Sequence, residues 1–283
     1  MELRELPSAE AFLAEAGPLL LRDEARHNLI LGICSTLDAA PAVYPEFHLW
    51  TVEDEGDVVA AAVMTPPYNL ALAEPATSEA VPFLAEQLHE RQVALPGVTA
   101  ALPEADAFAT AWAPVSGVVA RRRMRQGIYS ATRGDPPEDV PGRMRPIAEA
   151  DRNLVVGWLD AFADEVLPPD APHWDSEEAF ERRLAGTTGG YVLWETDAPV
   201  SLAGYGGRTP HGIRIGPVYT PPELRRRGYA SALVGTLTCD LVAGEADFCF
   251  LYTDLDNPTS NRIYQDVGYE LLAESVDYAF DPR

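Results

Sequence analysis

The sequence contains no lysine, because all 21 of its basic residues are arginine. This absence excludes enzyme classes that depend on a lysine side chain, which include P-loop nucleotide hydrolases, Schiff-base enzymes and pyridoxal enzymes. Cysteine is also scarce: Cys34, Cys239 and Cys249 lie far apart, and no Cys-x-x-Cys pair occurs. A sparse and odd set of cysteines predicts a reducing compartment and no disulfide framework.

Other absences narrow the choice further. The five histidines are scattered, with no His-Glu-x-x-His motif and no Cys/His cluster, so no metal site is predicted. No Gly-x-Ser-x-Gly motif marks a serine hydrolase. The acidic N-terminus lacks the apolar core of a signal peptide, and no apolar run approaches the length of a membrane span. We therefore expect a cytoplasmic protein that has no membrane partner.

Acidic residues dominate the charge. The chain has 44 Asp and Glu residues against 21 arginines, for a formal net charge of −23, and the excess is spread through both halves. Nucleic acids and anionic membranes need basic surface, so neither is an expected partner. The acidic balance tilts weakly toward a cationic substrate. The 283 residues, 47% of them hydrophobic, suit two domains of ordinary size or one large domain.

Two successive stretches predict the same order of elements. The first has helices within 8–39, a hairpin over 47–54 and 57–66, a strand at 69–73, a helix at 78–92, a strand at 98–102, a helix at 104–112 and an extended segment at 118–131. A Pro-rich, acidic stretch at 133–142 is interpreted as a linker. Beyond it come a strand at 144–147, helices at 150–166 and 175–184, strands at 191–195 and 200–206, the stretch 212–230 with its helix to about 242, a strand at 248–253, a helix from 258 and a strand at 269–280. The repeated order predicts a duplicated α+β domain, with one copy in residues 1–135 and the other in 142–283.

The stretch from Gly212 to Ala230 carries the strongest chemical signal. Its β-rich first part is interrupted by Gly216-Pro217, and proline in a strand marks an edge or a bulge. A bulge would splay this strand from the strand at 248–253. The freed N–H and C=O groups of Val218 and Thr220 would then be able to pair with an extended amide chain. An ordinary edge strand is the alternative.

A loop of arginine and glycine follows, Arg225-x-x-Gly228-x-Ala230, and opens a helix. The first N–H groups of a helix are unpaired and lie at the positive end of its dipole. Gly228 permits close approach of the backbone, and the small Ala230 leaves room beside the helix start. This arrangement predicts an anion site suited to a pyrophosphate. A solvated basic turn is the alternative.

A second run, from Asn257 to Tyr269, contains an asparagine, a serine, a tyrosine and a Gly-Tyr pair in order. Together the two runs resemble the GNAT superfamily of acetyl-CoA-dependent N-acetyltransferases. The arginine loop is similar to that family's (Gln/Arg)-x-x-Gly-x-(Gly/Ala) acyl-CoA motif. The later run is similar to its Asn…(Ala/Ser)…Tyr…Gly-(Phe/Tyr) motif. The resemblance covers residues 142–283.

The resemblance implies two α+β domains, each a mixed, mostly antiparallel twisted sheet flanked by helices. It implies a splayed-strand slot in the second domain that binds acetyl-CoA as co-substrate, with no metal. The main chain of Val218 to Thr220 would pair with the pantetheine arm, and the amides of residues 226–231 would hold the pyrophosphate. The residues implied in cofactor binding are Val218, Tyr219, Thr220, Arg225, Arg226, Arg227, Gly228, Tyr229, Ala230, Ser231, Asn257, Ser260 and Asn261.

The resemblance also implies catalytic roles. Tyr264 would protonate the leaving thiolate, since a phenol pKa of about 10 is close to that of an alkyl thiol. The backbone N–H of Val218 would polarise the thioester oxygen. A core tyrosine is the alternative for Tyr264. Several family members carry a carboxylate base on the anion-loop strand, whereas this strand has none between residues 212 and 220. The general base therefore stays open among Glu165, Glu195, Tyr205, His211, Asp254 and water.

The first half keeps the element order but lacks the motifs. Residues 71–77 contain neither arginine nor glycine, and residues 104–112 contain neither asparagine nor tyrosine. We interpret this half as a degenerate copy that does not bind CoA. Four nearby arginines, Arg121, Arg122, Arg123 and Arg125, favour a charge-balancing strand face over a nucleic-acid site.

The expected reaction is transfer of an acetyl group from acetyl-CoA to a primary amine of a small molecule or peptide. Two alternatives are a non-catalytic acyl-CoA-binding or sensing module and an acyltransferase that uses a longer acyl-CoA. The identity of the acceptor and the oligomeric state, monomer or homodimer, stay open.

Overall fold

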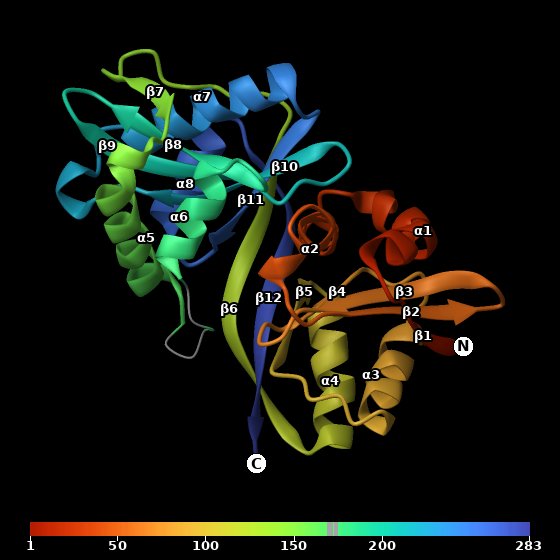
Figure 1. Ribbon diagram of the computed structural model, residues 1–283. Coiled ribbons are helices and arrows are strands. Elements are labelled where there is room, and N and C mark those ends of the chain that lie inside the picture. The colour runs from red at the N-terminus through yellow and green to blue at the C-terminus, as the bar shows by residue number, and fades with distance from the viewer. Residues whose placement is uncertain (169–171, 173–174) are drawn as a thin grey trace. The chain divides into compact units, whose positions relative to one another are not determined.

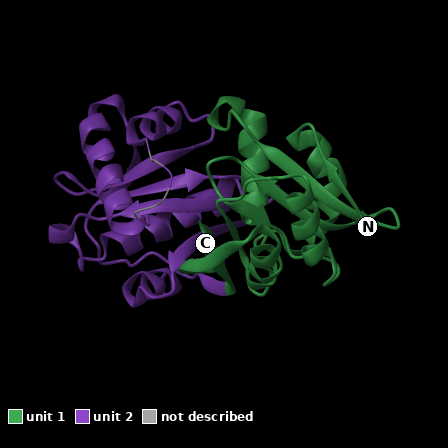
Figure 2. Cartoon of the chain, turned by 90° about the horizontal axis from the view of Figure 1, so that it is seen from below, with its two compact units in different colours: residues 1–128, 272–283 green, residues 129–271 purple. Residues whose placement is uncertain are grey.

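The computed structural model describes residues 1–168, 172 and 175–283. The chain divides into two compact units (Figure 2). Unit 1 contains residues 1–128 together with 272–283, and unit 2 contains residues 129–271.

Unit 1 is a sheet with helices on both faces (Figure 1). Its elements are β1 (Glu2–Glu5), α1 (Ala9–Leu20), α2 (Asn28–Ala39), β2 (His48–Asp54), β3 (Asp57–Met64), β4 (Leu70–Leu72), α3 (Ala80–Glu90), β5 (Gly97–Ala101), α4 (Glu104–Ser116) and most of β6 (Val118–Ala131). The strand order is β1-β2-β3-β4-β5-β12-β6, where β12 is Glu270–Pro282. Because neighbouring residues of a strand point to opposite faces, Trp50 packs with α3 and α4 while Leu49 packs with α1 and α2.

Unit 2 has the same construction. Its elements are β7 (Arg143–Pro146), α5 (Arg152–Val166), α6 (Ser176–Leu184), β8 (Gly189–Glu195), β9 (Pro199–Gly206), β10 (Gly212–Tyr219), α7 (Tyr229–Gly244), β11 (Phe248–Asp254) and α8 (Pro258–Asp266). The strand order runs β6-β11-β10-β9-β8-β7, and β10 pairs with β11 in parallel. Ile213 and Ile215 pack with α7, whereas Leu193 and Leu202 pack with α5 and α6 on the other face. Asp175 caps α6 by accepting from the Glu178 N–H at 2.9 Å.

The order strand, two helices, three strands, helix, strand, helix, strand occurs once in each half of the chain. The predicted α+β class with mixed, mostly antiparallel strands is confirmed. The predicted ranges 1–135 and 142–283 differ from the compact units at the final strand. β12 pairs antiparallel with β5, from Ser275 opposite Ala101 to Ala279 opposite Gly97, so residues 272–283 belong to unit 1. The ladder partner, and not the position in the chain, decides where a strand belongs.

The arginines of β6 each face an acid. Arg121 pairs with Asp281, Arg122 with Asp106, Arg123 with Asp277 and Arg125 with Glu274, at 2.8, 3.0, 2.5 and 2.7 Å. This is the charge-balanced strand face that the sequence favours.

The segment interpreted as a linker, 133–142, is packed against unit 2. The Asp135 N–H donates to the Val267 carbonyl at 3.1 Å, and the Cys239 thiol donates to the Gly134 carbonyl at 3.3 Å. A Cβ at Gly134 would stand inside contact distance of the Cys239 sulfur. The proline- and acid-rich composition predicts a linker, whereas the segment lies directly on α7, where Gly134 allows the close approach.

Candidate functional site

The strands β10 and β11 separate part-way along their length. Their ladder pairs Gly212 with Phe248, Ile213 with Cys249 and Arg214 with Phe250, and includes no later residue of either strand. The separation begins where β10 is bulged against β9, between Ile215 and Val218. The cis Gly216-Pro217 peptide lies within this bulge. The predicted bulge and splay are therefore both present.

The backbone of Val218 faces the resulting gap. On the β9 side, Ser201 donates its hydroxyl to the Tyr219 carbonyl at 3.1 Å, so that carbonyl points away from β11. Backbone groups of successive strand residues point to alternate edges. The N–H and C=O of Val218 therefore point toward β11. Thr220 lies on the same edge, but its carbonyl already accepts from Arg225 Nε at 2.8 Å, which leaves only its N–H for a ligand.

The loop between β10 and α7 presents a row of backbone donors. No group among the described residues accepts a hydrogen bond from the N–H groups of residues 226–231, and Gly228, the N-cap of α7, has no side-chain cap. Arg226 and Gly228 are both in the left-handed region, at φ 64° and 79°. A Cβ at Gly228 would lie 2.8 Å from a methyl group of Val140, so only glycine fits there without a shift. Unpaired amides at a helix N-terminus suit a phosphate group.

The three arginines of this loop have different surroundings. Arg225 forms a two-pronged ion pair with Glu165 at 2.7 and 2.9 Å, which ties the loop to the end of α5. Arg227 donates to the Glu223 carbonyl at 3.3 Å. Arg226 is exposed. Arg226 and Arg227 have no acid partner among the described residues, so their charges are available to an anion.

The predicted residues of α8 lie beside the end of β11. Asn257 caps the helix by accepting from the Ser260 N–H at 3.2 Å, which occupies its side-chain oxygen. Asn261 donates to the carbonyls of Asp254 and Leu255 at 3.2 Å. Its own Oδ1 is buried and has no partner among the described residues. Local capping accounts for these residues without a ligand, so their role in binding CoA stays a prediction.

Tyr264 combines a buried ring with an unpaired hydroxyl. The half-buried side chain packs on the α7-side core and meets Tyr269 edge to face, with ring centroids 6.2 Å apart. The hydroxyl has no hydrogen-bond partner among the described residues, whereas that of Tyr269 bonds Thr238 at 2.8 Å. Burial raises the pKa of Tyr264 to about 12. The phenol therefore stays protonated throughout the neutral and mildly alkaline range.

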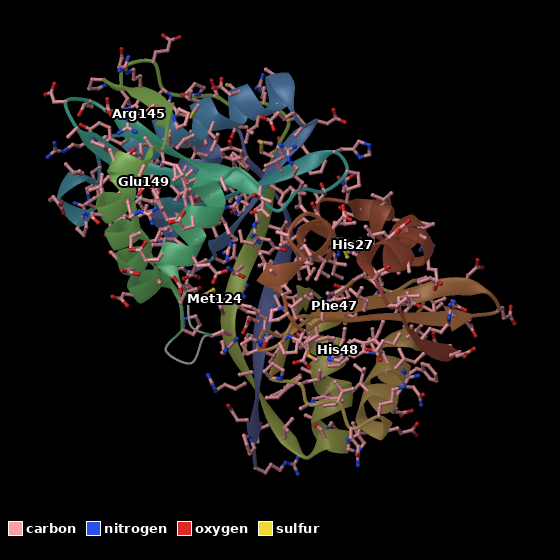
Figure 3. The ribbon with its side chains drawn as sticks, in the orientation of Figure 1. His27, Phe47, His48, Met124, Arg145 and Glu149 are labelled. Carbon is pink, nitrogen blue, oxygen red and sulfur yellow. The ribbon has the colours of Figure 1, made fainter. Side chains whose placement is uncertain are left out.

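The candidate bases fall into separate places. Glu165 is held by Arg225. Glu195 bonds Arg145, whose position is labelled in Figure 3 and which also pairs with Asp151 at 2.7 Å. Asp254 accepts from the Asp256 N–H at 2.9 Å. His211 precedes β10 at the end opposite the bulge, about 23 Å along the strand from Val218 at about 3.3 Å per residue. Tyr205 lies opposite Ile215 on β9. None is fixed as the base, and water stays among the candidates.

The corresponding loop in unit 1 is closed. The N–H of Ala73 donates to Ala61, and that of Ala76 donates to Val59, at 3.0 and 2.7 Å. The N–H of Glu74 donates to Nε2 of the buried His27 at 3.0 Å, and His27 Nδ1 bonds the Leu20 carbonyl at 2.8 Å (Figure 3). His27 is neutral, because one of its ring nitrogens accepts a hydrogen bond. Burial lowers its pKa, which also disfavours the protonated form. These amides all donate hydrogen bonds within unit 1, so they are not free to bind a ligand.

Comparisons with known proteins agree with this geometry. Residues 195–277 match the FR47-like protein family. A Drosophila protein of known structure superposes with a TM-score of 0.72 at 13% identity, over 99% of this chain and 98% of its own. A tandem GNAT protein from the clavulanic acid biosynthesis pathway gives 0.58 at 13%, with the same coverage. This chain has the GNAT fold in tandem form.

A GNAT-family acetyltransferase from Colwellia psychrerythraea also matches over 99% of this chain and 100% of its own, with a TM-score of 0.60 and 11% identity. No curated protein matches the sequence. The resemblance to the GNAT superfamily is confirmed in the fold of the whole chain, although the sequence motifs occur only in residues 142–283.

Two negative findings complete the site. Across the described ranges, no group of histidine, cysteine and acidic side chains is arranged to hold a metal ion. In the same part of the chain, no helix has the length and apolarity that crossing a membrane requires.

Proposed function

We propose that unit 2 transfers an acetyl group from acetyl-CoA to a primary amine. The observation that carries the proposal is the gap between β10 and β11 beside the unpaired N–H groups of residues 226–231. A strand edge accepts an extended amide chain, and a helix start accepts a phosphate. The two features together match the pantetheine arm and pyrophosphate of CoA.

Each residue then has a definite task. The amides of residues 226–231, with the charges of Arg226 and Arg227, hold the pyrophosphate. The Val218 N–H donates to the thioester oxygen as it gains negative charge. The neutral amine forms a bond to the carbonyl carbon, the carbon–sulfur bond breaks, and the electron pair leaves on sulfur.

Tyr264 donates a hydrogen bond from its phenol to this thiolate. With a pKa of about 12, the phenol is a weaker acid than an ordinary thiol, whose pKa is about 8.5, so a hydrogen bond to sulfur is favoured over complete transfer. The amine's proton leaves to water, because Glu165 and Glu195 are engaged in ion pairs, Asp254 accepts a backbone N–H, and His211 lies far along the strand from Val218. This route predicts a rate that rises with pH as the amine deprotonates.

The test is amine-dependent release of CoA thiol. The full chain is incubated with acetyl-CoA and a panel of primary amines, and free thiol is followed with a chromogenic disulfide while mass spectrometry detects the acetylated amine. The proposal predicts stoichiometric thiol and acetyl-amine with at least one amine. Binding of acetyl-CoA without transfer to any amine would instead favour the binding-module alternative. Faster turnover with butyryl-CoA than acetyl-CoA would favour the longer acyl group.

A further inference from the structure

Two half-buried arginines of unit 2, Arg183 and Arg214, lack an acid partner. Every other half-buried arginine of this acidic chain is ion-paired, as Arg26 is with Glu104 at 2.6 Å and Arg145 with Asp151 at 2.7 Å. Neither Arg183 nor Arg214 lies within ion-pair distance of any acid that the structure describes. With 44 acids available in the chain, two such exceptions need a cause.

The two guanidinium groups lie close together. Arg183, on α6, donates through Nη1 to the carbonyls of Thr188 and Tyr205 at 2.6 and 2.5 Å, and its Cζ lies 5.8 Å from the centre of the Tyr191 ring. A Cβ at Gly206 would clash with this Nη1, and a Cβ at Gly207 would meet Arg214 Nε at 3.5 Å. Gly206 therefore makes room for Arg183, and Arg214 lies in ordinary contact distance of the next residue, Gly207.

No acid among the described residues offsets their mutual repulsion. Burial lowers the pKa of Arg183 and the positive charge of Arg214 acts in the same direction, whereas Tyr191 acts in the opposite direction. A buried cation without a counter-ion is costly, and two neighbouring cations are more so. An anion between them would offset both costs. Arg183 is already engaged by two carbonyls and by Tyr191, so the N–H groups of Arg214 are the ones that can serve a ligand.

Arg214 also lies at the closed end of the proposed slot, where the gap between β10 and β11 begins. Ile213 and Ile215 point into the α7-side core, so Arg214 between them points to the α5–α6 face. Arg214 pairs with Phe250 in the last rung of the ladder before β10 and β11 separate. It lies four residues before Val218, about 13 Å along the strand. The α7 loop lies at the open, C-terminal end of β10, so an acceptor that approaches the other end of the slot from the α5–α6 face would meet Arg214.

We infer that Arg183 and Arg214 bind an anionic group, a carboxylate or a phosphate, on the amine acceptor. This inference rests on the proposed function and names the class of its substrate: a primary amine with an anion several bonds from the nitrogen. The excess of acidic residues over the whole chain favours a cationic acceptor, but the two arginines make the local charge on this face positive. Arg214 is the direct ligand. Arg183 adds the second charge and is fixed in place by its two carbonyl bonds.

The test compares matched acceptors that differ in charge alone. kcat/KM is measured for an ω-amino acid, its carboxamide and the aminoalkyl phosphate of similar length, in the wild-type chain and in Arg214→Gln. Loss of a charge-assisted hydrogen bond of about 1.5–3 kcal/mol corresponds to a decrease of about 10- to 100-fold in kcat/KM. We expect the wild type to prefer an anionic acceptor by that factor and Arg214→Gln to remove the preference. The ratio between carboxylate and phosphate identifies which anion the site takes.

Controls separate binding from folding. Arg182→Gln, which removes the neighbouring arginine of α6 and its pair with Glu178, should keep the preference. Arg214→Lys should retain part of it, and the affinity for acetyl-CoA should be unchanged in all three variants. As a readout without turnover, the N-acetylated ω-amino acid should raise the melting temperature of the wild type more than that of Arg214→Gln.

The outcomes for the two proposals are distinct. If amines are acetylated but the carboxamide reacts as fast as the acid, the anion subsite is wrong and the acetyltransferase stands. An anionic preference that survives Arg214→Gln would also overturn the assignment. If no amine is acetylated and the N-acetylated acid gives no difference between wild type and variant, both proposals fail.

Discussion

At the residue scale, the site depends on side chains whose hydrogen bonds are incomplete. The Tyr264 hydroxyl, the amides of residues 226–231 and the Arg183–Arg214 pair all lack the partners that similar groups have elsewhere in the chain. Buried polar groups in folded proteins are normally satisfied, and exceptions need an explanation. The chemistry is placed in unit 2 because these groups lie along and beside the gap between β10 and β11.

Tyr264→Phe tests the proton donor. The variant should lower kcat by about ten- to a thousandfold, because the thiolate loses its donor, while the ring keeps its packing on Tyr269. The dissociation constant for acetyl-CoA should change by less than about twofold. Steady-state thiol release and calorimetric titration measure the two quantities.

Tyr68→Phe, an exposed tyrosine of unit 1, is the matched control and should leave both values unchanged. Undiminished kcat in Tyr264→Phe would remove this phenol from the mechanism and leave it as a core residue.

At the element scale, the loop before α7 is shaped by one glycine. Gly228→Ala forces a Cβ into the left-handed region and against Val140, at a cost of about 1–2 kcal/mol. We expect lower stability in urea unfolding. Because the displaced amides are those assigned to the pyrophosphate, affinity for acetyl-CoA should fall by about tenfold or more.

Gly157→Ala is the control for this substitution. Gly157 lies on an exposed face of α5, where a Cβ would meet no atom within 4 Å, so alanine should stabilise the helix by about 0.5–1 kcal/mol. Equal affinity for acetyl-CoA in both variants would contradict the proposed role of the Gly228 loop.

Individual elements were largely predictable, because local chemistry decides them. Gly216-Pro217, for example, indicated the bulge in β10. β1 was not predicted: Leu3 is the only apolar residue of its four, so no alternation marks it. The partner of β12 was not predictable either, since the strand's own pattern is satisfied by any sheet edge with the right register. Arg183 and Arg214 were missed because only the fold brings residues of α6 and β10 together.

At the scale of the whole molecule, buried thiols and a buried phenol determine how the stability of the fold changes at alkaline pH. Burial raises the pKa of the thiols of Cys34 and Cys249 from 9.0 to about 12, and that of Tyr264 from 10.0 to about 12. At a pH between the ordinary pKa and the raised pKa of each group, the unfolded chain has lost a proton that the folded chain still holds. The stability is therefore full below about pH 9 and falls as the pH rises, by about 1.4 kcal/mol per pH unit for each group.

Urea unfolding at about pH 8 and about pH 10.5 should show this loss as a lower midpoint at the higher pH. The double variant Cys34→Ala and Cys249→Ala should be less stable at about pH 8 but lose less between the two pH values. A midpoint independent of pH over this range would mean that the thiols and the phenol titrate normally.

The two halves of the chain share an order of elements but differ at one loop, which joins β10 to α7 in unit 2 and β4 to α3 in unit 1. In unit 2 the amides of residues 226–231 are unpaired, whereas in unit 1 those of Ala73, Glu74 and Ala76 are bonded within the unit. The central claim is that the chain has one CoA site, in unit 2. Calorimetric titration of acetyl-CoA into the full chain tests it most directly. The account predicts one molecule bound per chain, with binding weakened by Gly228→Ala; two molecules per chain, or none, would contradict it.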